Sequence, residues 1–551
     1  MKALFSGFCY YDIAYCVQNV NQNGSAEKRT LDISGGDMTG FWVQDVELSL
    51  PSLKDNTADA DRLVQALKSR LGGDAVAVEL EVLRPLPEVL RSAGYHVRCV
   101  LYDDQGRWGI SAVVPADDTC AILGLAVDLG TTRVVIRLLD MTDGKVLGEA
   151  SFDNPQIAIG PDILTRIHYA DTPEGLEHLS QVITDALRHH AEALCASVGC
   201  SASDIYMVAV AGNTAMTHLF LKLNPRWIIR EPYIPVVNRP GMFQAGTLGI
   251  RFHPSARVFV FPNIGSYFGG DLIAGIMYAG LHRREETAIL VDVGTNAEVV
   301  LGNKDWMIAC AGAAGPALEG GAARMGMMAG PGVIDRVSIH PETLQWDIHT
   351  IENLPPVGIC GSGLIDLAAQ LFMHGMLDVR GKLAPDRCAE RIRTKDGLHH
   401  LVVVDRRISG TGEELTISQT DIDSLIRSKA AMYTILETLT ASVGITLREL
   451  TRFYVAGTFG AFINPVSAIT IGMIPDLKIE CYQTIGNSSL EGASRLIQDS
   501  QCMAEIDHIR DSITYMELNV NQEFMNRFSA AKFLPHTEPA LFPSVRPYRT
   551  S

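Results

Sequence analysis

The sequence lacks the cysteine pattern of a metal knuckle or a disulfide scaffold. Its 11 cysteines are scattered over 551 residues, and no two of them form a C-x-x-C pair. The pairs Cys9/Cys16 and Cys195/Cys200 are spaced too widely for a simple zinc site. We therefore interpret the cysteines as free thiols in a reducing compartment.

The chain is also poor in positive charge and in long apolar runs. Its 46 Lys and Arg side chains stand against 63 Asp and Glu, which gives a formal net charge of −17. This charge repels phosphate backbones and anionic membrane surfaces, so we expect neither nucleic acid nor a membrane as a partner. Asp, Arg or Gly breaks each longer apolar stretch before it reaches membrane-spanning length. These absences predict a cytoplasmic protein.

The sequence does have enough hydrophobic residues for several domains. They make up 47% of the chain, which excludes the disordered and collagen-like classes. The pattern divides the chain into an N-terminal arm (1–45), a small α/β linker domain (46–120) and a large α/β remainder (121–551). Within the linker domain, the spacing predicts a helix ending near 71, an alternating strand over 76–82, a short helix over 87–93, and strands near 96–102 and 108–114.

The large remainder contains an internal repeat. Residues 124–152 and 288–312 share one layout of strand, Gly-Thr turn, strand, polar turn and strand. When the two segments are aligned, Asp128 lies over Asp292, which follows it after 164 residues. The repeat predicts two related lobes.

A third glycine turn, at 457–460, follows an amphipathic helix predicted over about 419–443. Ser418, with Asp421 three residues later, is typical of a helix N-cap. Lys429 lies on this helix. It could contact a ribose or base, and a solvated lysine is about equally expected at this position.

An Asp-x-Gly-Thr turn between two strands suits a polyphosphate. Glycine lets the backbone approach the ligand closely, and its neighbours offer amide and hydroxyl donors. An aspartate at the strand end can hold Mg²⁺ directly or through waters, which magnesium gives up reluctantly. Two such hairpins facing each other would hold the phosphates of a nucleotide from both sides.

The two hairpins and the third glycine turn resemble the phosphate-1, phosphate-2 and adenosine motifs of the actin, sugar-kinase and heat-shock-chaperone ATPase superfamily. This resemblance implies an α/β fold with two ribonuclease H-like lobes that bind ATP and Mg²⁺, the metal being held by Asp128 and Asp292. It also implies a first phosphate loop formed by Asp128, Gly130, Thr131 and Thr132. The second phosphate loop is then formed by Asp292, Gly294, Thr295 and Asn296. The adenosine turn is formed by Gly457, Thr458 and Gly460.

Asp271 lies in the segment Gly-Gly-Asp-Leu-Ile-Ala-Gly at 269–275, just before the second hairpin. This segment resembles the one that carries the catalytic aspartate of carbohydrate kinases. Such a residue takes the proton of a substrate hydroxyl in a kinase and orients a water in an ATPase. The structural alternative is that Asp271 only caps a helix.

Several further segments resemble the ATPase part of the reductive activators of corrinoid proteins. Their linker domain is also similar to this one, beginning near 46–56. The resemblance covers about 46–551 and is carried by the segments 154–167, 209–221, 310–337, 358–367 and 455–476. Members of this family use ATP to return the corrinoid protein of a methyltransferase from Co(II) to Co(I), and electrons enter through an iron-sulfur cluster on the same chain.

The sequence departs from this family in its cysteines. A ferredoxin-like cluster needs four thiolates with a C-x-x-C among them. The arm offers only Cys9 and Cys16, and the C-terminal region only Cys481 and Cys502. Cys360 lies in a glycine-rich turn and is interpreted as a small buried residue. We therefore expect no iron-sulfur cluster on this chain.

The resemblance leaves several functions and partners open. The first is activation of a corrinoid protein with electrons from a separate ferredoxin-like donor. The second is a chaperone that reactivates a cobalamin enzyme and needs no electron donor. The third is a small-molecule kinase that uses Asp271 as its base. A homodimer is compatible with all three.

Overall fold

The computed structural model describes residues 42–71, 75–294, 297–312, 323–388, 390–395, 397–457, 463–518 and 522–546. Most of the predicted N-terminal arm therefore lies outside the described residues. The same holds for four of the predicted nucleotide contacts, namely Thr295, Asn296, Thr458 and Gly460.

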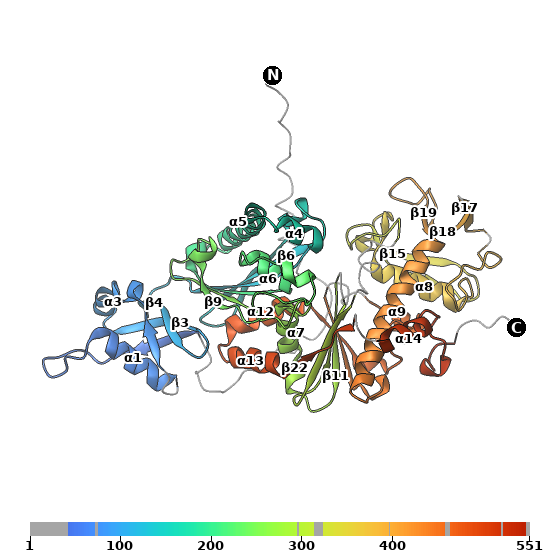
Figure 1. Ribbon diagram of the computed structural model, residues 1–551. Helices are drawn as coiled ribbons and strands as arrows, with labels where there is room; N and C mark the ends of the chain where they lie inside the picture. Colours follow the sequence, from blue (N-terminus) through green and yellow to red (C-terminus); the bar gives the residue numbers. More distant parts are fainter. Residues whose placement is uncertain are drawn as a thin grey trace, which may run out of the picture. The chain divides into compact units, whose positions relative to one another are not determined.

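The linker domain contains a four-stranded sheet with the strand order β1-β3-β4-β2 (Figure 1). Only β2 and β4 run parallel; the other neighbouring pairs are antiparallel. Leucines of α1 and α3 pack against the sheet and form the core of this domain. Its elements are β1 (Val43–Glu47), α1 (Asp59–Arg70), β2 (Val76–Val78), α2 (Leu80–Leu83), α3 (Leu86–Ser92), β3 (His96–Asp103) and β4 (Trp108–Pro115).

Two expectations for this domain need correction. The strand predicted over 76–82 ends at Val78, and Val82 is buried on the short helix α2. A short segment with an apolar residue at every second position fits a strand and a helix about equally well, which explains the error. In addition, β1 crosses the predicted end of the arm at residue 45 and pairs with β3.

The first lobe is built on a six-stranded sheet with the order β7-β6-β5-β8-β10-β9 (Figure 1). The predicted meander is confirmed, because β5 and β7 both pair antiparallel with β6. The lobe contains β5 (Leu123–Leu129), β6 (Arg133–Asp140), β7 (Val146–Asp153), α4 (Ile163–Tyr169), α5 (Pro173–Ser197), β8 (Ile205–Gly212), α6 (Thr214–Phe220), β9 (Gly241–Gln244), β10 (Arg257–Val260) and α7 (Gly270–Ala279).

The second lobe is built on another six-stranded sheet, with the order β21-β20-β11-β12-β13-β22. The helix α9 starts at the predicted capping box of Ser418 and Asp421, which is confirmed. The sheet and its helices are β11 (Ala288–Val293), β12 (Ala297–Gly302), β13 (Met307–Gly312), α9 (Gln419–Ser442), β20 (Arg452–Ala456), β21 (Tyr482–Gly486), α12 (Ser488–Gln498), α13 (Cys502–Ser512) and β22 (Ile513–Tyr515).

Two three-stranded sheets and further helices complete the second lobe. Their orders are β15-β14-β16 and β17-β18-β19. They share one hydrophobic core with α8, α9 and α14. These elements are β14 (Val333–Ile339), β15 (Trp346–Thr350), β16 (Gly358–Ile359), α8 (Gly361–Met373), β17 (Ile392–Lys395), β18 (Leu398–Val404), β19 (Leu415–Ser418), α11 (Pro465–Thr470) and α14 (Gln522–Ala531).

The two six-stranded sheets share one topology over five strands. β7-β6-β5-β8-β10 in the first lobe matches β13-β12-β11-β20-β21 in the second, with the same parallel and antiparallel pairings. A helix follows the fifth strand of each set, α7 in the first lobe and α12 in the second. The duplicated lobes predicted from the sequence repeat are confirmed.

Helix α12 packs on the first lobe, although β21 of the second lobe precedes it in the chain. It contacts α7, β5, β6 and β8 (Figure 1). Its apolar residues Leu490, Ala493, Leu496 and Ile497 share a core with strands of both lobes. The C-terminal part of the chain therefore completes the packing of the first lobe.

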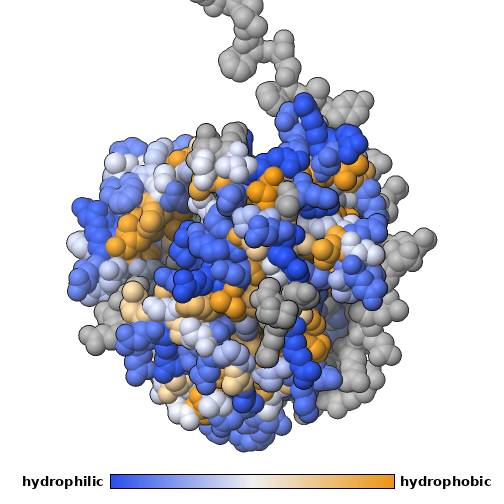
Figure 2. Space-filling model, turned by 90° about the vertical axis from the view of Figure 1, so that its right-hand side faces the viewer, coloured by the Kyte–Doolittle hydropathy of each residue, from blue (hydrophilic) through white to orange (hydrophobic). Residues whose placement is uncertain are grey.

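The surface mixes polar and apolar residues. Over the face drawn in Figure 2, hydrophobic residues form small groups among hydrophilic ones. Among the described residues, no helix combines the length and the apolar character needed to cross a membrane.

Candidate nucleotide site

The first predicted phosphate loop connects β5 to β6. Asp128, one residue before the end of β5, pairs with Val135 and Ala211 in the sheet. A Cβ atom on Gly130 would lie 2.2 Å from the carbonyl oxygen of Arg133, so this turn requires glycine. The side chain of Thr131 is fixed, because its Oγ1 accepts a hydrogen bond of 2.9 Å from Nδ2 of Asn213.

The second predicted phosphate loop occupies the matching place after β11. Asp292 pairs with Ala456, the last residue of the neighbouring strand β20. Gly457 follows with a φ of +82°, and a Cβ atom there would lie 2.9 Å from Oδ1 of Asp292. Gly457 thus lies directly against the aspartate of the second hairpin. Contact of Gly457 with adenosine stays a prediction.

Asp271 stands in the first turn of α7. The N-cap of this helix is Gly269, so the alternative that Asp271 is only an N-cap is wrong. Oδ1 of Asp271 accepts a hydrogen bond of 2.9 Å from the amide of Leu272. A Cβ atom on Gly269 would lie 2.6 Å from that oxygen and 2.3 Å from Cα of Asn213, which leaves room only for glycine.

The three predicted aspartates form one electrostatic cluster. Burial first, and then the negative charges of Asp292 and Asp128, raise the pKa of Asp271 to about 7. Burial, together with the charge of Asp128, likewise raises the pKa of Asp292 to about 7. Carboxylates brought together in a recessed place favour a bound cation or a shared proton, which is typical of functional sites.

Two further residues belong to this site and are not among those predicted from the sequence, Asn487 and Ser489. Nδ2 of Asn487 donates to Oδ2 of Asp128 at 2.8 Å, and Oγ of Ser489 donates to Oδ1 at 2.9 Å. Burial raises the pKa of Asp128, while these two hydrogen bonds lower it. The duplicated topology could have revealed these residues, because the start of α12 is the counterpart of the start of α7, which carries Asp271.

Lys429 does not have either of the roles that the sequence suggested. Its side chain is completely buried, so the solvated alternative is wrong. Its Nζ donates to the carbonyl oxygens of Phe533 and Pro535, at 2.5 and 2.7 Å, and burial lowers its pKa well below the usual value. These bonds attach the C-terminal segment to α9, and we do not retain Lys429 among the proposed nucleotide contacts.

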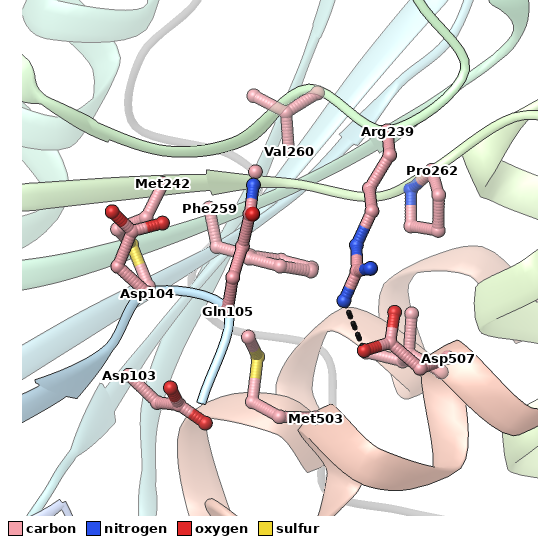
Figure 3. A pocket seen from close by; sticks show the side chains of 12 residues that line it. Asp103, Asp104, Gln105, Arg239, Met242, Phe259, Val260, Pro262, Met503 and Asp507 are labelled. Carbon is pink, nitrogen blue, oxygen red and sulfur yellow. Dashed lines mark hydrogen bonds and ion pairs between the residues drawn. The ribbon is translucent and has the colours of Figure 1, made fainter. Parts of the chain in front are cut away.

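A separate pocket lies between the linker domain, the first lobe and α13 (Figure 3). It is formed by the turn between β3 and β4, the edge strand β9 with its neighbour β10, and α13. None of the three site aspartates lines it. Arg239 and Asp507 form an ion pair in it. Burial raises the pKa of Asp103, and the charges of Asp104 and Asp507 add to this effect. The pocket marks the junction of the linker domain with the first lobe and α13.

Among the described residues, no group of three or more His, Cys, Asp or Glu side chains is arranged to hold a metal ion by itself. The donor set of Asp128 and Asp292 nevertheless fits Mg²⁺, which usually keeps several waters and binds proteins through one or two carboxylates. A nucleotide phosphate would supply the remaining charge.

The sequence matches three family models, one after another along the chain. They are described as the RACo linker region, the RACo middle region and the C-terminal domain of RACo, the ASKHA domain, and they match residues 39–120, 123–284 and 286–546. A solved structure described as a reductive activator for corrinoid, iron-sulfur protein is 39% identical, with a TM-score of 0.82 over 94% of this chain and 82% of that chain. The chain belongs to the RACo family. Its two lobes therefore have the actin-like ASKHA fold that the sequence predicted.

Two curated relatives agree with the RACo assignment. The corrinoid activation enzyme RamQ of Eubacterium limosum is 29% identical over 458 residues, which is 82% of this chain and 76% of that protein. The [Co(II) methylated amine-specific corrinoid protein] reductase of Methanosarcina barkeri is 24% identical over 437 residues, 73% of this chain and 75% of that protein. The matched RACo linker region starts at residue 39 and so includes β1.

Proposed function

We propose that this chain is an ATP-dependent reductive activator that returns the corrinoid protein of a methyltransferase system from Co(II) to Co(I). The observation that carries the proposal is the meeting of Asp128 and Asp292, from two duplicated hairpins, with Asp271 at the start of α7. This cluster lies in a chain of the RACo family, whose relatives are named for corrinoid activation and reduction.

The residues around the cluster support the binding of ATP with Mg²⁺. Asp128 and Asp292 would hold the metal, and the turn at Gly130 would receive phosphates through its amides. Mg²⁺, when bound, neutralises phosphate charge. Asp271 has a pKa of about 7 and can accept a proton from an attacking water near neutral pH.

Hydrolysis of ATP to ADP and phosphate supplies the driving force for a change in the lobe arrangement. We propose that this change acts on a bound corrinoid protein, so that its Co(II) accepts one electron. The electron comes from a separate ferredoxin-like protein with a low potential. The partners meet in the cytoplasm, and the activator works as a monomer or a homodimer.

The test is ATP hydrolysis by the purified protein, with and without a corrinoid protein of the same organism. Cobalt absorbance is followed at the same time under a low-potential reductant. The proposal expects the partner to stimulate hydrolysis and Co(I) to form only when ATP is present. Phosphoryl transfer to a small molecule would instead support the kinase alternative. Cobalamin exchange without reduction would support the chaperone alternative.

The variant Asp292→Ala tests the site assignment. Because Asp292 belongs to the carboxylate cluster, we expect this variant to lose binding of Mg·ATP in calorimetric titration. The matched control is Asp305→Ala, since Asp305 is exposed in the turn between β12 and β13, at the far end of β12 from the second phosphate loop. Equal ATP affinity in the Asp292 variant and the control would overturn the assignment.

A further inference from the structure

All three carbonyl groups of the first phosphate loop are held from one side by the segment 154–166. Nδ2 of Asn154 donates to the carbonyl oxygen of Gly130 at 2.9 Å, and the amide of Asn154 donates to that of Thr132 at 2.8 Å. Between them, Nη1 of Arg166 donates to the carbonyl oxygen of Thr131 at 2.8 Å. No carbonyl of this loop is left to turn toward a ligand.

This arrangement decides where the amides of the loop point. The C=O group of one residue and the N–H group of the next lie in the plane of their trans peptide bond and point in opposite directions. With the carbonyls of residues 130–132 held by Asn154 and Arg166, the amides of the residues that follow them face away from that segment. A loop of successive amides aimed the same way is suited to an anion.

Arg166 is an unusual group to find behind this loop. Its side chain is completely buried, and no carboxylate of the described residues lies within ion-pair distance of it. It donates instead to the carbonyl oxygen of Gly160 at 2.8 Å and to Oε1 of Gln156 at 3.3 Å, while its Nη2 has no partner among the described residues. Burial lowers the pKa of Arg166 to about 10, although the charge of Asp162, beyond ion-pair distance, offsets part of this effect. The guanidinium is therefore still charged at neutral pH.

A buried charge without a carboxylate partner is unfavourable unless another negative group offsets it. The chain keeps such a charge directly behind the loop that contains Gly130 and Thr131. A bound polyphosphate would bring negative charge to the other side of this loop. A ligand on the other side of the loop would therefore account for a charge that the hydrogen bonds of Arg166 within the fold leave without a carboxylate partner.

We propose that Asn154 and Arg166 are positioning residues that make the first phosphate loop selective for the polyphosphate of a nucleotide. Asn154 aims the amides of the loop, and Arg166 both aims them and supplies a positive charge behind them. Neither residue touches the nucleotide. The inference rests on the proposed function, because it assumes that a nucleoside triphosphate binds at this loop.

The experiment compares ATP, ADP and adenosine as ligands of the full chain, with Mg²⁺ present, by calorimetric titration. For Arg166→Met we expect ATP and ADP to bind about 10- to 100-fold more weakly, as for the loss of a charge-assisted hydrogen bond. We expect adenosine, which has no phosphate, to bind as it does to the wild type. Arg166→Lys keeps the charge but not the planar donor geometry, so its affinity for ATP and ADP should lie between those of Arg166→Met and the wild type.

The matched control is Arg391→Met in the second lobe. Arg391 also donates to main-chain carbonyls, those of Val402 and Val403, at 3.1 and 3.3 Å. It stands just before β17 in the second lobe, away from the phosphate loop. We expect this control to bind all three ligands like the wild type. If Arg166→Met does not fold, Asn154→Asp takes its place, because it keeps the shape of the side chain and loses the donor to Gly130.

Two results would overturn the inference while leaving the proposed function intact. One is an equal loss of ATP and adenosine affinity in the Arg166 variant, which would indicate a structural role only. The other is unchanged ATP affinity. Failure of the wild type itself to bind ATP would overturn both the proposed function and this inference.

Discussion

At the residue scale, the three aspartates lower the stability of the folded protein when no ligand is bound. Asp292 and Asp271 each have a pKa raised to about 7, because burial and neighbouring carboxylates disfavour the charged form. An unfolded chain releases these protons near the ordinary aspartate value. Between about pH 4 and pH 7 the folded state therefore binds more protons, and its stability falls as the pH rises through this window.

We therefore expect Asp292→Asn to stabilise the unliganded protein. The gain should be a few degrees in Tm at about pH 8, where the wild-type carboxylate is ionised, and should shrink toward about pH 4.5. Thermal unfolding in the presence of a chelator measures it. The control Asp305→Asn, at an exposed position, should leave Tm unchanged at both pH values. A variant less stable than the wild type at both pH values would contradict the argument.

At the scale of elements, helix α12 is the part that joins the site to the second half of the chain. Asn487 caps the helix through the amide of Leu490, and at the same time its Nδ2 holds Asp128. Ser489 holds the other oxygen of the same carboxylate. The start of α12 thus orients a proposed metal ligand that precedes it by more than 350 residues.

Ser489→Ala tests this role without weakening the helix, because alanine is the better helix former. We expect Mg·ATP to bind about 10- to 150-fold more weakly, as for the loss of a hydrogen bond to a charged group worth about 1.5–3 kcal/mol. Calorimetric titration measures the change, and Tm reports on the fold. Ser494→Ala, on the same helix and bonded to the carbonyl of Leu490, should bind like the wild type. If the two variants bind equally, α12 does not orient the site.

The sequence predicted those elements whose signals are local. The Asp-x-Gly-Thr hairpins and the capping box of Ser418 depend on neighbours a few residues away, and both are confirmed. The errors at the site concern contacts between distant residues. Lys429 meets carbonyls more than 100 residues later, and the partners of Asp128 stand on α12. Neither spacing nor periodicity records such pairs.

At the scale of the whole molecule, the linker domain is attached to the same helix that reaches the site. Nε1 of Trp42 donates to the carbonyl oxygen of Leu496, near the end of α12, at 2.7 Å. The domain also contacts the first lobe through Glu79, which accepts from Tyr102 at 2.7 Å and pairs with Arg257. A movement of α12 at Asp128 therefore reaches the linker domain through a continuous helix.

We expect the emission of Trp42 to report this movement, because its indole is buried and hydrogen-bonded to α12. Mg·ATP should change tryptophan fluorescence of the wild type. In Trp42→Phe, ATP should still bind in calorimetric titration, while most of the fluorescence change disappears. Trp227→Phe, at an exposed position of the first lobe, is the control and should keep the change. A full signal in the Trp42 variant would place the movement elsewhere.

The position of α12 also has a consequence for synthesis on the ribosome. The strands of the first lobe are complete when residue 260 has been made, but the face under α12 stays uncovered until residue 498 emerges. At 5–20 residues per second, this interval lasts about 10–50 s. During that time the nascent first lobe presents apolar strand residues without their partner helix. A nascent chain stalled before α12 emerges should therefore bind chaperones. A chain stalled after residue 498 has emerged should bind them less.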